Sequence, residues 1–188
     1  MKILHCADIH LDSKMENKLT SEQARERRGE ILAGFHNMLD YAEENGIQTV
    51  LIAGDLFDRR HIRKTVKDEV KQEFISHKDI EFYYLRGNHD ITDFLDDMDE
   101  IPKNLHLFSA DKWTSYRCPD NIVITGRELD AKSSSDLISE MVLDPSKVNI
   151  VMLHGQDSEY QSRDNAYTIE LPKLRNHYID YLALGHVH

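Results

Sequence analysis

The chain has 188 residues and a formal net charge of −11, with 34 acidic residues against 23 basic ones. This length suits one globular domain, and the acidic excess argues against a protein that binds nucleic acid mainly through a basic surface. Cys6 and Cys118 lie far apart and form no metal-binding pair, so we expect a reducing compartment and no disulfide. Charged residues interrupt every apolar segment before it reaches the length of a signal peptide or membrane span, and we expect a cytoplasmic protein without membrane attachment.

Short apolar segments that are typical of buried strands recur along the chain. They span residues 2–7, 49–53, 80–85, 121–125, 148–153 and 179–184. Between the first two, apolar residues recur at helical spacing. Thr20 and Gln23 stand before this stretch as a capping box, and Gly46 follows it as a stop. These features predict a helix between Thr20 and Gly46.

Two further amphipathic stretches separate later strands. Apolar residues at every fourth position over 62–74 predict a second helix, and residues 137–142 form a third stretch with helical spacing. Segments 105–108 and 113–118 follow each other without a helix, so antiparallel or mixed pairing is expected there. Strands that alternate with helices predict a layered α/β fold.

Side chains of the metal-binding type follow five of the apolar segments. They are Asp8 and His10; Asp55 and Asp58; Asn88, His89 and Asp90; His154; and His186 and His188. Because the carboxyl ends of strands form the ligand crevice of α/β sheets, residues far apart in sequence converge there. Each motif alone is compatible with a turn, but five in succession predict a metal site. The remaining histidines are interpreted as structural: His5, His36, His61, His77, His106 and His177.

The order of these motifs carries a family resemblance. They read Asp8-Ile9-His10, Gly54-Asp55-Leu56-Phe57-Asp58, Gly87-Asn88-His89-Asp90, His154-Gly155 and Gly185-His186-Val187-His188. The set resembles that of calcineurin-like metallophosphoesterases, and its flanking residues are most similar to the SbcD-type DNA repair exonucleases. The resemblance implies a four-layer α/β/β/α sandwich with mixed sheets and a metal site at the carboxyl ends of the strands. Nucleases of this branch continue beyond the last motif, so residues 1–188 are expected to be a catalytic domain truncated at its C-terminal end.

The resemblance also implies a role for each site residue. Asp55 would bridge two divalent ions, with Asp8, His10 and His188 completing one ion and Asn88, His154 and His186 completing the other. Mixed nitrogen and oxygen ligands suit manganese, iron or zinc, and the family favours manganese. A bridging hydroxide would attack phosphorus, His89 would give a proton to the leaving oxygen, and Asp58 would orient His89.

The substrate is predicted from charge. Arg59, Arg60 and Arg63 follow the Asp55 motif and suit a nucleic-acid backbone, although a solvated helix start explains them equally well. Two divalent ions, two carboxylates and a hydroxide leave a single positive charge, which a phosphodiester neutralises. A phosphomonoester would need further cations, such as Arg59 or Arg86.

Two other function classes stay open beside the nuclease. The resemblance favours a DNA exonuclease or endonuclease with an SbcC-like ATPase partner and a homodimer in the full-length protein. The first alternative is a serine/threonine protein phosphatase or a small-molecule phosphodiesterase of the same superfamily. The second is a metal-dependent scaffold without activity, which is disfavoured because no ligand position is lost.

Overall fold

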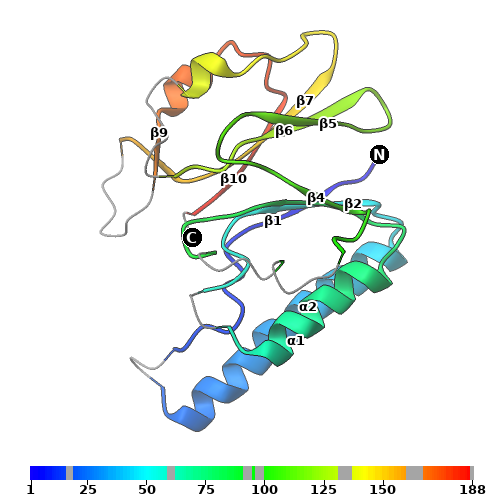
Figure 1. The fold of residues 1–188 in the computed structure, drawn as a ribbon, viewed down its shortest axis with the longest axis vertical. Helices are drawn as coiled ribbons and strands as arrows, with labels where there is room; N and C mark the ends of the chain where they lie inside the picture. The colour runs from blue at the N-terminus through cyan, green and yellow to red at the C-terminus, as the bar shows by residue number, and fades with distance from the viewer. Residues whose placement is uncertain are drawn as a thin grey trace.

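In the computed structural model, two four-stranded sheets are stacked face to face (Figure 1). The structure describes residues 1–15, 19–58, 62–90, 95, 100–130, 137–159 and 167–186. The first sheet has the order β1-β2-β3-β4, with all neighbours parallel. Its strands are β1 (Leu4–Cys6), β2 (Thr49–Ala53), β3 (Glu81–Leu85) and β4 (Leu105–Leu107).

Two helices lie side by side on the outer face of the first sheet (Figure 1). Helix α1 (Ser21–Glu44) joins β1 to β2, and α2 (Lys64–Ser76) joins β2 to β3. The predicted capping box is confirmed, because the Gln23 N–H donates to Thr20 Oγ1 at 3.3 Å and the Thr20 N–H donates to Gln23 Oε1 at 3.0 Å. Gly46 has a φ of 63° just after α1, the left-handed conformation that ends many helices. No helix within the described ranges is both long and apolar enough to cross a membrane.

The second sheet has the order β10-β7-β6-β5 and is mixed. Its strands are β5 (Thr114–Arg117), β6 (Ile122–Gly126), β7 (Val148–His154) and β10 (Tyr181–Gly185), and a short pair is formed by β8 (Gln156–Asp157) and β9 (Thr168–Ile169). The expected antiparallel pairing is confirmed for β5, which runs antiparallel to β6. It is wrong for β4, which is parallel to β3. Residues 86–104 between them are long enough for the crossover that parallel strands need.

Alternation along β2 shows how the layers are built. Val50 and Ile52 pack against the helices, whereas Leu51 and Ala53 pack against the second sheet. Successive side chains of a strand point to opposite faces, so one apolar strand serves two cores. The buried position of β2 between both layers explains its unbroken apolar sequence.

The outer face of the second sheet is covered by short 3-10 helices in the described part of the chain. These are η1 (Leu137–Glu140) and η2 (Leu171–Leu174), and they contribute to a third apolar cluster. The α/β/β/α layer order is therefore present, with single turns in its fourth layer. The third amphipathic stretch ends after one turn, leaving Val142 86% exposed. Pro145 follows closely, and the residue before a proline disfavours helical backbone.

Candidate metal centre

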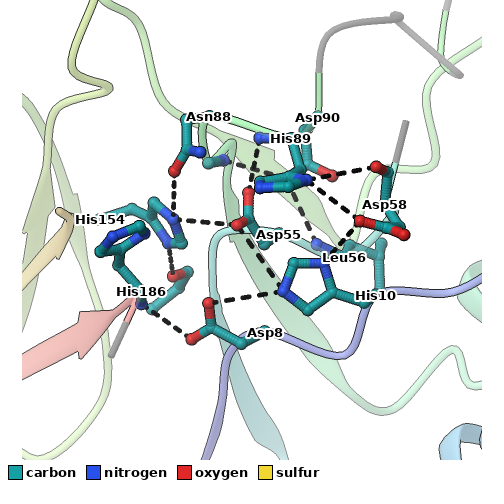
Figure 2. Close-up of polar contacts among 12 residues, drawn as sticks. Asp8, His10, Asp55, Leu56, Asp58, Asn88, His89, Asp90, His154 and His186 are labelled. Carbon is teal, nitrogen blue, oxygen red and sulfur yellow. Dashed lines mark hydrogen bonds and ion pairs between the residues drawn. The ribbon is translucent and has the colours of Figure 1, made fainter. Parts of the chain in front are cut away.

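The predicted metal-binding and catalytic residues that the structure describes converge where the parallel strands of both sheets end (Figure 2). Asp8 and His10 follow β1, Asp55 and Asp58 follow β2, Asn88 and His89 follow β3, His154 ends β7, and His186 follows β10. Strands with the same direction end on the same side, so residues distant in sequence become neighbours. His188, Arg59 and Arg60 lie outside the described residues.

Asp55 occupies the centre of the cluster and is 1% exposed. Its Oδ2 lies 3.3 Å from His154 Nε2 and 3.9 Å from His10 Nε2, and its Oδ1 accepts the His89 N–H at 2.8 Å. Two groups of three side chains bring their ligand atoms within 4.8 Å of one another and share this carboxylate: Asp8, His10 and Asp55; and Asp55, His154 and His186. The geometry therefore offers two adjacent positions with one common carboxylate.

The tautomer of His154 indicates what the position formed by Asp55, His154 and His186 can hold. His154 Nδ1 lies 2.8 Å from the Ala53 carbonyl oxygen, which can only accept, so Nδ1 carries a proton. In the neutral ring, the Nε2 lone pair faces Asn88 Oδ1 at 3.1 Å and Asp55 Oδ2 at 3.3 Å. Burial lowers the pKa of His154, but the hydrogen bond and charge of Asp55 raise it more. Three converging acceptor atoms fit a cation.

Asp8 indicates that the other position, formed by Asp8, His10 and Asp55, also fits a cation. Its Oδ2 accepts the His186 N–H at 2.8 Å. Its Oδ1 is buried and accepts no hydrogen bond from any described residue, with His10 Nε2 at 3.9 Å. A buried carboxylate oxygen without a donor is costly unless a cation binds it. Carboxylate and imidazole donors without thiolate suit divalent manganese, iron or zinc.

Asp58 lies between two imidazoles at the edge of this cluster. Its Oδ1 is 3.1 Å from His89 Nδ1 and 3.3 Å from His10 Nδ1. Burial raises the pKa of Asp58, but hydrogen bonds from His10 and Ser13 and the charges of both imidazoles lower it to about 2. The contact with His89 agrees with the orienting role implied by the resemblance, whereas the contact with His10 was not expected. A persistently ionised Asp58 holds His89 Nδ1 and leaves Nε2 to face solvent or substrate.

The backbone around the cluster adopts conformations that most residues avoid. Asp8, His10 and Asp55 have φ values of 55°, 51° and 51°, and His186 has a φ of 109°. Such conformations cost about 1–3 kcal/mol each and persist where the surroundings enforce them. Here the Asp8 N–H donates to the Gly54 carbonyl at 3.1 Å and the His10 N–H to the Asp55 carbonyl at 3.0 Å. Positive φ values occur at other non-glycine residues too, but these four all lie in the loops that carry the cluster.

Two motif glycines, Gly54 and Gly87, lie where the backbone comes too close to a site side chain for any other residue to fit. A Cβ atom at Gly54 would lie 2.1 Å from His154 Nδ1, and one at Gly87 would lie 2.2 Å from Asp55 Oδ1. Only glycine lets these backbones come so close to the two side chains. The glycine positions therefore belong to the same geometry as the ligand-type residues.

Asp90, to which sequence reasoning gave no role, ties two of the loops together. Its carboxylate accepts backbone N–H groups from Leu56 at 3.3 Å, Phe57 at 2.9 Å and Gly87 at 2.9 Å. Burial raises the pKa of Asp90 to about 6 although these three bonds oppose the shift. Asp90 therefore joins the loop after β2, which carries Asp55, to the loop after β3.

Two further carboxylates that the sequence analysis missed hold arginines beside the cluster. Asp12 accepts the Arg63 backbone N–H at 2.7 Å and its Nε–H at 2.6 Å, and Glu128 accepts Arg86 Nε–H at 3.0 Å and Nη2–H at 2.8 Å. Asp12 continues the alternation of Asp8 and His10, a signal that was available. No sequence signal pointed to Glu128, because its partner Arg86 follows a strand of the other sheet.

The family is shown by comparison with known proteins. The family model for calcineurin-like phosphoesterases matches residues 1–188. The chain belongs to the calcineurin-like phosphoesterase family. This phosphoesterase is therefore a metal-dependent hydrolase, in agreement with the donor set at the strand ends.

Individual relatives are more distant. The phosphoesterase is 26% identical over 198 residues to the uncharacterized metallophosphoesterase YhaO of Bacillus subtilis, covering 100% of this chain and 48% of YhaO. It is 26% identical over 196 residues to the DNA double-strand break repair protein Mre11 of Sulfolobus acidocaldarius, covering 100% of this chain and 50% of that protein. The chain thus spans about half the length of both relatives. Among solved structures, nuclease MPE of Pseudomonas putida aligns with 77% of this chain and 57% of its own, at 15% identity and a TM-score of 0.36.

Proposed function

We propose that this phosphoesterase is a DNA nuclease of the SbcD type, in which residues 1–188 form the catalytic domain and two manganese ions are the cofactor. The observation that carries the proposal is the pair of ligand groups that share the buried Asp55. Beside them, His89 and Asp58 form a contact suited to proton transfer.

The proposed ligand set combines this arrangement with the resemblance of the motifs, which supplies His188. One ion would take Asp8, His10, Asp55 and His188, and the other would take Asp55, Asn88, His154 and His186. Bound divalent ions supply a water-derived nucleophile at neutral pH and neutralise charge on the phosphate. The protein itself holds the ligands in a strained, hydrogen-bonded frame, and His89, held at Nδ1 by Asp58, gives a proton from Nε2 to the leaving oxygen.

Among the residues that the structure describes, the charges around the cluster support a phosphodiester over a phosphomonoester. Arg63 is ion-paired with Asp12, and Arg86 is held by Glu128. Neither pair adds net positive charge to the centre. A phosphodiester carries one negative charge, whereas a monoester dianion needs additional cations to bind well.

DNA is the proposed substrate because all of this chain is similar, at 26% identity, to half of Mre11, a DNA double-strand break repair protein. Arg59, Arg60 and Arg63 are proposed to contact the DNA backbone. An SbcC-like ATPase partner and a homodimer are part of the proposal for the whole protein, and they rest on the resemblance of the motifs.

A comparison of hydrolysis rates on different substrates tests the proposal. We expect the chain with Mn²⁺ to cleave single-stranded and hairpin DNA, and the Asp55→Asn variant to lose at least 100-fold in rate, because both ions lose a ligand. Hydrolysis of a phosphopeptide and of a phosphodiester nucleotide is measured separately under the same conditions. Phosphopeptide hydrolysis without DNA cleavage would support the phosphatase alternative. Metal binding without hydrolysis of any ester would support the scaffold alternative.

A further inference from the structure

An ion pair joins the two sheets beside the metal centre. The Arg86 backbone N–H donates to Glu128 Oε1 at 3.1 Å, and the guanidinium donates Nε–H to Oε1 at 3.0 Å and Nη2–H to Oε2 at 2.8 Å. The Glu128 side chain is 7% exposed, whereas that of Arg86 is 39% exposed. Bidentate contacts of this kind fix both partners in one geometry. A buried carboxylate of the second sheet therefore holds the first residue of the loop after β3.

The pair lies at the same end of the molecule as the metal centre. Arg86 precedes Asn88 by two residues, so the Cα atoms of these two residues are within about 7 Å of each other. Glu128 stands two residues after β6, and His154 ends the parallel neighbour β7. Glu128 therefore leaves the second sheet at the same end as His154, and the pair borders the centre on the side of β6.

The pair is partly shielded from water. A cavity of about 60 Å³ adjoins it, lined by the two charged residues and by four aromatic or aliphatic ones: Tyr84, Leu95, Leu107 and Phe108. Electrostatic interactions are stronger where apolar side chains replace water, and even exposed charges are screened by salt only beyond about 8 Å. An uncompensated charge on Arg86 would therefore act on an anion at the neighbouring metal centre.

The charge balance of the centre depends on this pair. In the proposed function, two divalent ions, two carboxylates and a hydroxide leave one positive charge, which a phosphodiester monoanion neutralises. A phosphomonoester dianion needs a second positive charge. Arg86 adds none while the Glu128 carboxylate is bound to it, and it would supply that charge if the carboxylate were absent.

We propose that Glu128 determines the substrate preference of the metal centre by neutralising Arg86, so that phosphodiesters are favoured over phosphomonoesters. The inference rests on the proposed function, because it concerns the choice of substrate at that same site. Glu128 is buried and acts through Arg86, so it is a specificity-determining residue that does not itself touch the substrate.

The ratio of two hydrolysis rates tests this role. With Mn²⁺, kcat/KM is measured on bis-nitrophenyl phosphate, a diester, and on nitrophenyl phosphate, a monoester. The Glu128→Gln variant keeps an oxygen for the Arg86 N–H but loses the negative charge, so we expect its monoester-to-diester ratio to rise about tenfold. Glu140→Gln is the matched control, because Glu140 pairs with Arg127 at η1, and it should keep the wild-type ratio.

A double variant separates the effect of charge from a disturbance of structure. Arg86→Gln with Glu128→Gln removes both charges, so its ratio should return to within about twofold of the wild-type value although the ion pair is absent. If Glu128→Gln acts by loosening the loop after β3, the double variant keeps or enlarges the change, and the proposal fails. An unchanged ratio in Glu128→Gln alone overturns it as well.

Binding of inorganic phosphate gives a readout that needs no catalysis. At about pH 8, where most of this anion carries two charges, calorimetric titration should show about tenfold tighter binding to the Mn²⁺-loaded Glu128→Gln variant than to the Mn²⁺-loaded wild-type chain. Equal affinities would overturn the proposal. A wild-type chain that prefers the monoester would instead contradict the proposed phosphodiesterase function, and the phosphate titration would still decide the role of Glu128.

Discussion

The His89 ring contacts the cluster carboxylate Asp58 through Nδ1, so the proposed catalytic role of His89 can be tested separately from metal binding. Its Nδ1 lies 3.1 Å from Asp58, and its side chain is 37% exposed. If Nε2 protonates the leaving oxygen, the His89→Asn variant should keep its metal content and lose about 10²–10⁴-fold in kcat on DNA. Elemental analysis and steady-state rates measure both quantities.

The leaving group decides whether this loss comes from proton donation. A phosphodiester with a nitrophenolate leaving group needs no proton, so the same His89→Asn variant should lose much less of its rate on that substrate. An equal loss on both substrates would mean that His89 only positions substrate. A wild-type rate on DNA would remove His89 from the mechanism altogether.

Asp90 acts on the site through the backbone. An amide in place of its carboxylate keeps one acceptor oxygen but turns NH₂ donors toward a backbone N–H group. The Asp90→Asn variant should therefore lose about 1–3 kcal/mol of unfolding free energy, the cost of one buried polar group without a partner. Urea denaturation measures this loss, and Asp79→Asn on the exposed surface should leave stability unchanged. Stability of Asp90→Asn equal to that of the control would contradict the role of Asp90 as the link between the two loops.

Ligand-type residues were easier to predict from sequence than the residues that hold them. Asp8, Asp55 and His154 each follow an apolar strand within a recognisable motif, so the order of strands and motifs is enough to infer their convergence. Glu128 could not be inferred, because its contact with Arg86 joins segments that are adjacent only after the sheets have stacked. The contact of Asp58 with His10 was also missed, although the two residues follow neighbouring strands of the first sheet.

At the scale of elements, a salt bridge fastens the loop after β1 to the start of α2. Asp12 is 5% exposed at its side chain and receives both the backbone N–H and the guanidinium of Arg63. Because Asp12 follows His10 by two residues, we expect Asp12→Asn and Arg63→Gln to weaken metal affinity about 10–100-fold alike. Calorimetric titration with Mn²⁺ measures this change.

The same pair of variants separates this role from DNA binding by Arg63. If Arg63 contacts a phosphate, only Arg63→Gln lowers the salt dependence of DNA affinity, by about one unit of slope. If the arginine only fastens the loop, both variants keep the wild-type slope. A normal metal affinity in both variants would contradict the fastening role.

Strands and the first helix were predictable because local patterns determine them. The capping box at Thr20 and the apolar alternation of β2 act within a few residues. The parallel pairing of β4 and the short η1 were not predictable, because pairing direction depends on the crossover path. In η1, the apolar spacing of a helix was overridden by Pro145 and by packing.

For the whole molecule, the first sheet brings three carboxylates, Asp8, Asp55 and Asp58, to one end of the sandwich, and the second sheet covers them from its side with His154 and His186. Burying like charges costs free energy, so we expect the folding of the chain to be coupled to cation binding. A ligand that binds only the folded chain at 100 times its Kd adds about 2.7 kcal/mol of stability. For a domain of this size, this corresponds to a rise in Tm of about 5–10 °C per ion.

Thermal unfolding with and without Mn²⁺ therefore tests the metal centre independently of any substrate. We expect a rise in Tm for the wild-type chain and little or none for Asp55→Asn, because that variant removes the carboxylate shared by both groups. Without metal, the Tm of Asp55→Asn should equal or exceed that of the wild-type chain. The variant relieves the repulsion among the carboxylates, while its amide oxygen still accepts the His89 N–H. Asp79→Asn should show the full wild-type rise. An equal rise in Asp55→Asn would mean that Mn²⁺ stabilises the chain elsewhere and that Asp55 does not hold the ions.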